Sequence, residues 1–133
     1  FGAKIRKNVV IRPSVKITYP WKLTLGDYAW VGDDAVLYTL GEITIGANSV
    51  VSQKCYLCTG SHDFMSQHFD ITASPIVIGE KCWLATDVFV APGVSVGDGT
   101  VVGARSSVFK SLPANKICRG NPAVVIRERV ETD

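Results

Sequence analysis

An aliphatic residue returns at every sixth position through most of this sequence. The longest unbroken run is Ile78, Leu84, Val90, Val96, Val102 and Val108. Shorter runs with the same period are Ile5, Ile11 and Ile17, then Leu25, Val31 and Leu37, then Ile45, Val51 and Leu57. The phase slips by two residues between these runs, at Leu23–Thr24 and at Ile43–Thr44. A period of six fits neither an α-helix, which repeats every 3.6 residues, nor an alternating strand, which repeats every two.

This period is typical of a solenoid in which each hexad supplies one short strand and one turn. Three hexads close one triangular coil, and we expect coils to begin near residues 5, 25, 45, 78 and 96 and to stack about 4.8 Å apart. The aliphatic residue points into the prism, and a small or aliphatic residue four positions later fills the corner. These corner positions are Cys82, Val88, Val94, Thr100, Ser106 and Leu112. We expect the glycines that follow three aliphatic positions to permit a tight turn there. The alternative is a β-sandwich whose sequence shows the six-residue period by chance. Six consecutive matches to the period make this a poor explanation.

The repeat is interrupted once, after the stretch "YLCTGSHDF". The hexads run from about residue 5 to 62 and from about 78 to 112. Residues 63–77 are therefore an excursion loop, and His62 closes the coil before it. Long loops that leave a rigid scaffold usually carry function. Residues 113–133 form a C-terminal segment with turns at Pro113 and Gly120–Pro122, whose amphipathic end we expect to cover the open end of the solenoid.

The composition fits a single domain that spans residues 1–133. Apolar residues make up 47% of the chain, charged residues 20%, and the formal net charge of +2 is too small to indicate nucleic-acid binding. We expect no transmembrane segment, because no apolar run approaches the ~20 residues that one needs. The start of the chain has no signal-peptide pattern and no initiator Met, so a fragment of a longer protein remains an open alternative.

Four cysteines are present, and Cys55 and Cys58 form a CxxC pair. A zinc site needs two more ligands at comparable spacing, and a thioredoxin-like motif needs a βαβ unit. Neither is found, so packing of small residues in strands is the favoured interpretation, and no metal is predicted. Free thiols without a disulfide framework favour a reducing compartment, the cytoplasm.

The sequence resembles a known family over essentially its whole length. The residues that carry the resemblance are Ile45-Gly46, the His62 that follows Thr59-Gly60-Ser61, and "PIVIGEKCWLATDVFVAPGVSVGDGTVVGARSSVFKSLPANKICRGNPAVVIRER". It is similar to the hexapeptide-repeat acyltransferases of the galactoside, maltose and nodulation acetyltransferase type. "YPWKL" and "LCTGSHDF" bring it closest to the colanic-acid branch, the WcaF type. The resemblance implies an all-β fold, a left-handed parallel β-helix, with one excursion loop and a short C-terminal extension.

The resemblance also implies a reaction. The family is trimeric, uses acetyl-CoA as co-substrate, and has active sites in clefts between neighbouring prisms. Its catalytic base is the histidine that closes the coil before the loop, which is His62 here. The imidazole would take the proton of an acceptor hydroxyl, whose oxygen attacks the thioester, and hydrogen-bond donors would stabilise the oxyanion. Imidazole suits this role because it titrates close to neutral pH. A lone histidine is otherwise more often an ordinary loop residue, and His68 is either a substrate-side or a merely solvated residue.

A carboxylate or a carbonyl commonly orients such a base, and Asp33, Asp34 and Asp63 are the candidates. The family has an Asn or an acidic residue near the first two, so Asp34 and Asp63 are predicted to bind the acceptor. Solvated turn residues explain the pair Asp33-Asp34 equally well.

On the cofactor side, Trp83 matches a tryptophan that packs along the CoA arm, although a Trp that simply covers the prism wall is the alternative. The other matched cofactor-binding positions are Thr86, Ala104, Lys110 and Arg127. The cations would meet the diphosphate. The chain departs from the family at Phe109, where Thr is frequent, and at Val124, where a cation is frequent. The chain would then either bind CoA less tightly or use Arg119 to supply the missing positive charge.

Other functions remain to be weighed. A γ-class carbonic anhydrase shares the prism but needs three zinc-binding histidines, and this chain has two. A non-catalytic structural prism has no reason to keep His62, Trp83 and Lys110 together. Serine acetyltransferase carries a large helical N-terminal domain that this chain lacks. The acceptor stays open between a sugar or polysaccharide hydroxyl and a xenobiotic such as an antibiotic. Aromatic residues that could stack on a sugar, or pack between subunits, are Trp30, Tyr38, Phe64 and Phe69.

Overall fold

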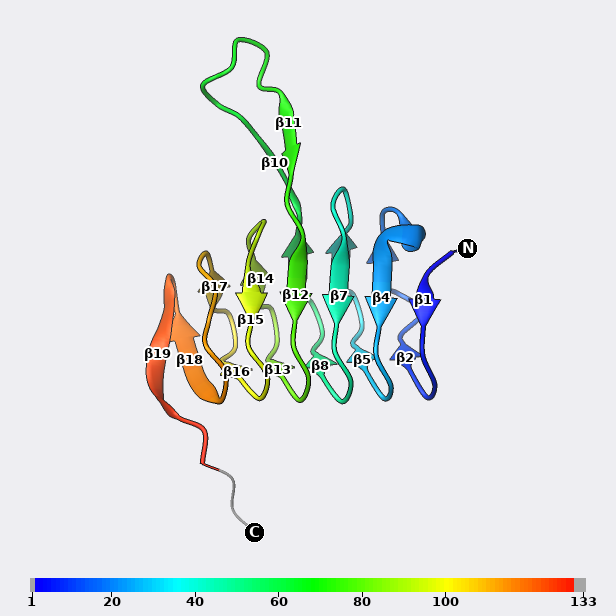
Figure 1. Ribbon diagram of the computed structural model, residues 1–133, viewed down its shortest axis with the longest axis vertical. Coiled ribbons are helices and arrows are strands. Elements are labelled where there is room, and N and C mark those ends of the chain that lie inside the picture. The colour runs from blue at the N-terminus through cyan, green and yellow to red at the C-terminus, as the bar shows by residue number, and fades with distance from the viewer. Residues whose placement is uncertain (1, 131–133) are drawn as a thin grey trace.

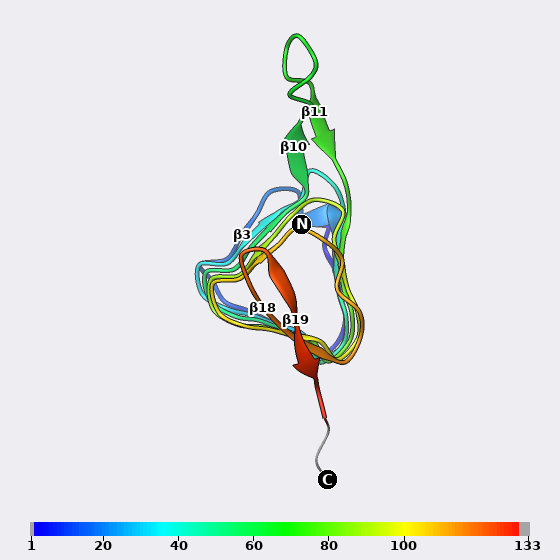
Figure 2. The same ribbon diagram turned by 90° about the vertical axis from the view of Figure 1, so that its left-hand side faces the viewer.

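Parallel pairing between successive runs of the repeat winds the chain into a triangular prism, as the computed structural model of the protein shows (Figure 1). The structure describes residues 2–130. Three sheets form the walls of the prism, and a separate two-stranded hairpin projects from it (Figure 2). The predicted parallel β-solenoid is confirmed.

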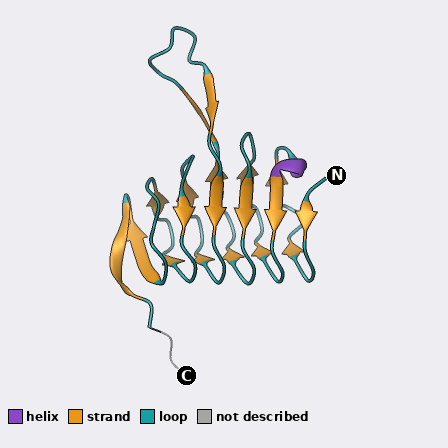
Figure 3. Ribbon diagram, in the orientation of Figure 1, coloured by secondary structure: helices purple, strands orange, loops and turns teal. Residues whose placement is uncertain are grey.

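Each wall is a stack of short strands, one from each coil (Figure 3). Sheet A contains β1 (Lys4–Ile5), β4 (Leu23–Leu25), β7 (Ile43–Ile45), β12 (Ile76–Ile78) and β15 (Ser95–Val96). Sheet B contains β2 (Val10–Ile11), β5 (Trp30–Val31), β8 (Val50–Val51), β13 (Trp83–Leu84), β16 (Val101–Val102), β18 (Lys116–Gly120) and β19 (Ala123–Glu128). Sheet C contains β3 (Lys16–Ile17), β6 (Val36–Tyr38), β9 (Tyr56–Cys58), β14 (Phe89–Val90) and β17 (Ser107–Val108). Within the three walls neighbouring coils pair in parallel, and β19 runs antiparallel, on β18.

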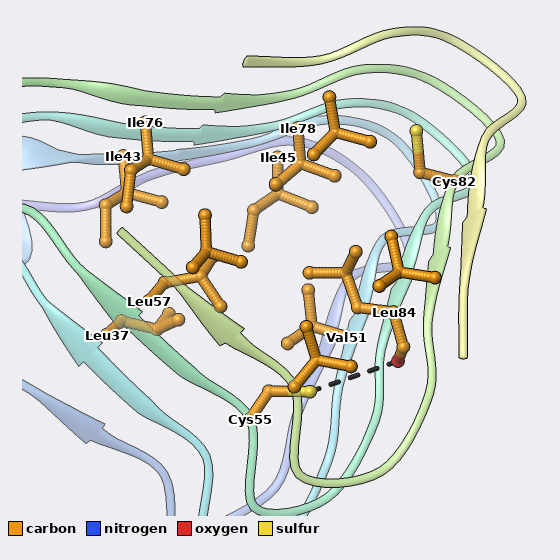
Figure 4. Packing of buried hydrophobic residues seen from close by; sticks show 14 of the residues in the cluster. Leu37, Ile43, Ile45, Val51, Cys55, Leu57, Ile76, Ile78, Cys82 and Leu84 are labelled. Carbon is orange, nitrogen blue, oxygen red and sulfur yellow. Dashed lines mark hydrogen bonds between the residues drawn. The ribbon is translucent and has the colours of Figure 1, made fainter. Parts of the chain in front are cut away.

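The core consists of the aliphatic positions of the repeat. Register pairs Leu25 with Ile45, Ile45 with Ile78, and Ile78 with Val96, so like positions stack along the prism (Figure 4). Every aliphatic repeat position from Leu25 to Val108 is at most 2% exposed, and the predicted corner residues from Cys82 to Leu112 are buried as well. The first coil differs, since Ile5 is 42% exposed. No earlier coil covers it within residues 2–130, so its side chains have neighbours on one side only.

Hydroxyl side chains connect the coils at the corners. Ser49 is fully buried, donates from Oγ to the Gly79 carbonyl at 2.5 Å and accepts from the Cys82 N–H at 3.0 Å. Thr59 joins the Tyr38 carbonyl and the Gly41 N–H in the same way. No buried side-chain nitrogen or oxygen in the described part of the chain lacks a hydrogen-bond partner. The corners therefore bury polar groups without an uncompensated desolvation cost.

The glycines of the repeat serve a different purpose from the one expected. Gly79, Gly97 and Gly103 do not have positive φ, so they do not supply a left-handed turn conformation. A Cβ on Gly79 would instead lie 2.9 Å from the Asp98 nitrogen of the next coil, and one on Gly97 would lie 2.5 Å from the Ala114 nitrogen. The expectation of a turn glycine was wrong at these positions. Glycine is present because the next coil passes too close to admit a side chain.

All length variation in the coils falls at one corner, the third corner, where sheet C leads into sheet A. Leu25 follows Ile5 by twenty residues, whereas Val96 follows Ile78 by eighteen. The two extra residues lie around the 3₁₀ turn η1 (Pro20–Lys22) in the first coil. The slip at Ile43–Thr44 follows the same corner one coil later. The corners between sheets A and B, and between sheets B and C, are called the first and second corners below.

The excursion is the largest insertion at the third corner. It forms the antiparallel hairpin of β10 (Gly60–His62) and β11 (Ile71–Ala73), which projects beyond the prism in Figures 1 and 2. The excursion was expected to span residues 63–77, but the hairpin already starts at Gly60, and Ile76 is back in sheet A. His62 thus lies on the hairpin rather than on the third coil, because its backbone pairs with Ile71.

The C-terminal segment extends sheet B and then crosses the end of the prism (Figure 2). Cys118 on β18 is fully buried, and Ala123 on β19 packs against the core. Arg129 donates to the carbonyls of Lys81 and Gly99, both at 2.9 Å, which fixes the end of the segment to the first corner. Residues 131–133 of the predicted segment lie outside the described residues. Nothing helical between residues 2 and 130 is long and apolar enough to cross a membrane.

Candidate active site

His62 is exposed on the hairpin, and one of its ring nitrogens is fixed. Its Nδ1 lies 2.8 Å from the backbone carbonyl oxygen of Phe69. A carbonyl can only accept, so Nδ1 carries the hydrogen and donates it. In the neutral ring this leaves Nε2 with its lone pair free toward solvent. One ring nitrogen is therefore held and the other is available, an arrangement that can accept a proton.

The loop between the hairpin strands holds the Phe69 carbonyl in place. Ser66 is the centre of this loop, since its Oγ donates to the Asp63 carbonyl at 2.9 Å and accepts from the Asp70 N–H at 2.7 Å. The Asp63 N–H donates to the Asp70 carbonyl at 2.8 Å and closes the loop at its base. Phe69 has a φ of 51°, which is rare for a bulky residue. The orientation of His62 therefore depends on a backbone conformation that these hydrogen bonds maintain.

A small hollow lies beside His62. It has a volume of about 80 Å³ and is lined by Tyr38, Leu40, Gly60, Ser61, His62 and Ile71. Gly60 is necessary for this shape, because a Cβ there would lie 2.6 Å from Leu40 Cδ1 and 2.7 Å from Tyr38 Cε2. Two larger open hollows, of about 520 and 380 Å³, lie at the first coil and contain none of the predicted site residues.

None of the three candidate carboxylates orients His62 within this chain. Asp33 accepts from Arg12 Nε at 3.2 Å and from Ser14 Oγ at 3.4 Å, at the second corner. The Asp63 carboxylate accepts from the Met65 N–H at 3.0 Å and shapes the hairpin loop. Asp34 is exposed, and its carboxylate makes no hydrogen bond within residues 2–130. A backbone carbonyl performs the role for which a carboxylate was expected.

Trp83 and Arg127 lie in one row on the outer face of sheet B. Register carries this row from Trp83 to Val101, to Ile117 and to Arg127, three strand spacings or roughly 14 Å. Trp83 is half exposed, and its Nε1 donates to Ser52 Oγ at 2.9 Å. The indole is thus a fixed apolar wall with a cation at the far end of its row.

Thr86 and Ala104 lie at the second corner, in successive coils beside that wall. The backbone of this corner stacks from coil to coil, as in the hydrogen bond from the Arg105 N–H to the Thr86 carbonyl. Thr86 Oγ1 donates to the Gln53 carbonyl at 3.1 Å. Asp34 lies at the same corner two coils earlier. One continuous surface therefore carries Trp83, Thr86, Ala104, Asp34 and, at its end, Arg127.

Lys110 and His62 lie elsewhere, at the third corner. Lys110 follows β17 of sheet C and precedes Leu112, which bridges to sheet A. The hairpin that carries His62 leaves sheet C after β9 and returns at β12 of sheet A. Sheet C separates this corner from the second one. The structure therefore brings the predicted site residues together in two groups, on two different corners of the same prism.

Cys55, Cys82 and Cys118 are buried in the prism, and Cys58 is half-buried. All four are free thiols. Burial raises the pKa of the Cys55 thiol to about 11, and burial also raises the pKa of Cys82. Cys55 donates to the Ala85 carbonyl at 3.1 Å, and Figure 4 shows its sulfur pointing into the core. In the described part of the chain no three His, Cys, Asp or Glu side chains gather to hold a metal ion.

Sequence reasoning missed several contributors to the site. The Phe69 carbonyl is a backbone group and leaves no mark on residue identity. Ser52, which holds Trp83, and Ser66, which holds the hairpin loop, look like ordinary polar residues in the sequence. Their roles depend on contacts that the sequence does not show: Ser52 lies 31 positions from Trp83, and Ser66 lies four positions from Asp70. Only the repeat register could have placed Ser52 beside Trp83, because residues 50–51 and 83–84 pair.

The repeat identifies the class of protein. A family model described as "Bacterial transferase hexapeptide (six repeats)" matches residues 75–110, which covers the fourth and fifth coils.

Proteins of similar sequence show which kind of hexapeptide-repeat transferase this is. The chain is 88% identical over 133 residues to the colanic acid biosynthesis acetyltransferase WcaF of Escherichia coli (strain K12). The alignment covers all of this chain and 73% of that protein. The chain is 28% identical over 134 residues to the galactoside O-acetyltransferase of the same organism, with 98% and 66% covered. The chain therefore belongs to the hexapeptide-repeat acetyltransferases and is an enzyme of that kind.

Solved structures agree with this assignment. A hexapeptide-repeat acetyltransferase from Vibrio cholerae superposes with a TM-score of 0.92 at 25% identity, covering 98% of this chain and 76% of that one. A galactoside acetyltransferase in complex with coenzyme A superposes with a TM-score of 0.91 at 27% identity, covering 96% and 65%.

Proposed function

We propose that this enzyme transfers the acetyl group of acetyl-CoA to a hydroxyl of a sugar or polysaccharide precursor, with His62 as the general base. The observation that carries the proposal is the hydrogen bond from His62 Nδ1 to the Phe69 carbonyl, which leaves Nε2 as a free base. The name of the 88% identical relative supports a polysaccharide precursor as acceptor. The coenzyme A complex of a galactoside acetyltransferase supports the donor.

The reaction needs one base and one leaving group. Nε2 of His62 takes the proton of the acceptor hydroxyl as its oxygen attacks the carbonyl carbon of the thioester. The Phe69 carbonyl stabilises the imidazolium that forms, because its dipole faces the Nδ1 hydrogen. The tetrahedral oxyanion then collapses, the carbon–sulfur bond breaks, and the imidazolium returns its proton to the CoA sulfur. The products are an O-acetyl ester and free CoA.

The outer face of sheet B is the proposed cofactor wall. Trp83, held by Ser52, would pack along the pantetheine arm, and Ala104 leaves room for it at the second corner. Thr86 would lie near the thioester. Arg127 would meet the diphosphate as a cation. Val124 lacks the expected charge, but Arg119 is its direct cross-strand partner and supplies one at the same place. Phe109 beside Lys110 gives a more apolar nucleotide pocket than a threonine would.

We further propose that the enzyme works as a homotrimer whose active sites lie between copies. His62 and Lys110 lie at the third corner, whereas Trp83, Thr86, Ala104 and Asp34 line sheet B and the second corner. One prism cannot bring these corners together, since sheet C lies between them. A neighbouring copy can, when its third corner meets the second corner of the first. Asp34 and the hairpin residue Asp63 would then face the acceptor from opposite sides.

The cytoplasm is the proposed location. Acetyl-CoA is supplied there, and the four free cysteines suit a reducing environment. Three of the four are buried, and no disulfide forms among them.

The test is transfer from acetyl-CoA, followed as thiol release and as ester formation by mass spectrometry. Acceptors are hexoses, nucleotide sugars, lipid-linked glycans and a chloramphenicol-like alcohol. We expect a sugar acceptor to stimulate release, and His62→Ala to lose at least ~10² of the rate. His68→Ala is the matched control, because it removes the same side chain from the same loop. Preference for the antibiotic would replace the sugar proposal, and full activity in His62→Ala would refute the base.

A further inference from the structure

The stretch Tyr19-Pro20-Trp21-Lys22 places two neighbouring aromatic rings at the third corner of the first coil. Pro20 begins the 3₁₀ turn η1, because its fixed φ suits the first helical position. The ring centroids of Tyr19 and Trp21 lie 5.0 Å apart, with an angle of 33° between the ring planes. Trp21 is nevertheless 58% exposed, and Tyr19 is 37% exposed. The packing of the prism therefore leaves this aromatic pair open to a ligand.

Hydrogen bonds hold the aromatic pair in place. The fully buried Thr39 accepts from the Tyr19 N–H at 2.7 Å and donates from Oγ1 to the Tyr19 carbonyl at 3.0 Å. The Lys22 N–H donates to the same carbonyl at 3.0 Å. The Lys22 ammonium lies 5.6 Å from the centre of the Tyr19 ring and donates to the Leu40 carbonyl at 2.6 Å. Because the rings are already fixed, a ligand that packs on them pays little side-chain entropy.

The aromatic pair lies on the same edge of the prism as His62. Figure 3 shows η1, drawn in purple, on the side from which the hairpin projects. The turn η1 precedes β4 and the hairpin precedes β12, with β7 between these strands in sheet A, so the two lie two strand spacings apart, roughly 10 Å. Leu40, whose carbonyl holds Lys22, lines the hollow beside His62. One continuous surface thus leads from the proposed base to the aromatic pair.

We propose that Trp21 and Tyr19 form a subsite for a further sugar residue of the acceptor, which is therefore an oligosaccharide or polysaccharide chain. This inference rests on the proposed function, because it takes His62 as the place where the acetyl group is transferred. The C–H face of a pyranose ring packs on an aromatic face while the sugar hydroxyls stay in water. A chain that reaches both places gains a contact that a single sugar beside His62 cannot make. The subsite thus selects long acceptors over monosaccharides and small alcohols.

The test measures how the affinity for sugars changes with their length. The probes are malto-oligosaccharides and fragments of colanic acid, from the monosaccharide to the hexasaccharide, and calorimetry measures binding. We expect the dissociation constant of the wild type to fall about 10-fold between the monosaccharide and the trisaccharide. Trp21→Ala should lose that gain and bind the monosaccharide as the wild type does. Tyr28→Ala is the matched control, because it removes a ring that is 54% exposed at the first corner.

Trp21→Met keeps an apolar side chain without a ring, and it decides the question if Trp21→Ala fails to fold. Three results would overturn the proposal: a wild-type affinity that does not rise with length, a gain that survives in both Trp21 variants, or an equal loss in Tyr28→Ala. A lost gain with a changed mass in sedimentation equilibrium would assign Trp21 to a subunit contact instead. A nucleotide that binds more tightly than any sugar, and only with Trp21 present, would assign the rings to a nucleobase.

Acetyl transfer is measured separately with the same series of sugars. Sugars that bind through Trp21 in a length-dependent way but are not acetylated would contradict the proposed function alone. Acetylation at the same rate for every length, unchanged in Trp21→Ala, would contradict this inference alone.

Discussion

Replacing Gly46 with alanine tests why glycine occurs in the repeat. The new Cβ would lie 2.6 Å from the Gly79 carbonyl carbon and oxygen in the next coil, where 3.5–4.0 Å is normal for carbon atoms. The third and fourth coils would have to separate by about 1 Å at the first corner. That movement breaks the hydrogen bonds from the Gly46 N–H to the Ile78 carbonyl and from the Lys81 N–H to the Ala47 carbonyl, now 2.8 and 3.0 Å.

Two lost hydrogen bonds at about 1 kcal/mol each, with 1–3 kcal/mol of overpacking, give a cost of about 3–5 kcal/mol for Gly46→Ala. Gly93→Ala is the control. Its φ is +81°, but a Cβ there would meet nothing closer than Ser74 Cβ at 3.5 Å. It should cost about 1–2 kcal/mol, the penalty of a left-handed conformation. Urea titration gives both free energies of unfolding. The close-approach explanation is wrong if Gly93→Ala proves the more costly of the two.

Three further predictions concern the site and the core. Ser52→Ala removes the acceptor of the Trp83 N–H, so the dissociation constant of acetyl-CoA measured by calorimetry should rise about 2- to 10-fold with little loss of stability; an unchanged constant would argue against Trp83 as a cofactor wall. Gly60→Ala should displace the base of the hairpin by about 1 Å and lower kcat by up to ~10²-fold while acetyl-CoA binding is kept. Burial raises the pKa of Cys55 from 9.0 to about 11, so the folded state keeps a proton that the unfolded chain loses. The free energy of unfolding should therefore fall by about 2–3 kcal/mol between about pH 9 and 11, and Cys55→Ala should remove that part of the decline in urea titrations at several pH values.

The core could be predicted residue by residue because the repeat makes each position locally explicit. Leu57 and Val90 lie six-residue steps from their neighbours, and both are fully buried. The corner residues followed from the same spacing. The first coil could not be judged in this way, since Ile5 fits the repeat but pairs with only one other coil within residues 2–130.

The glycines and the hairpin show where a one-dimensional pattern loses information. The repeat marks Gly79 as special, but only the distance to the next coil explains why a side chain is excluded there. His62 was singled out by its place beside the excursion. The group that orients it is the Phe69 carbonyl, seven residues away on the other side of the loop. Backbone groups have no identity in a sequence, so a carboxylate was the natural expectation.

The prediction that these residues bind the cofactor comes only from the resemblance. Periodicity alone assigns Trp83 to an outer face and Lys110 to a corner, without saying that sheet C separates them. That separation emerges only when the coils are closed into a prism. Because of this separation, the proposed chemistry requires a site to which two copies of the chain contribute residues.

Mixing two inactive variants tests the shared site most directly. His62→Ala removes the proposed base, and Trp83→Glu disrupts the proposed cofactor wall, so each variant alone should transfer little or no acetyl group. In trimers assembled at random from equal amounts, about a quarter of the clefts join an intact His62 to an intact Trp83 of the next copy. The account predicts that acetyl transfer recovers to about that share of the wild-type rate in mixed trimers verified by two affinity tags. Verified mixed trimers that show no recovery would contradict it.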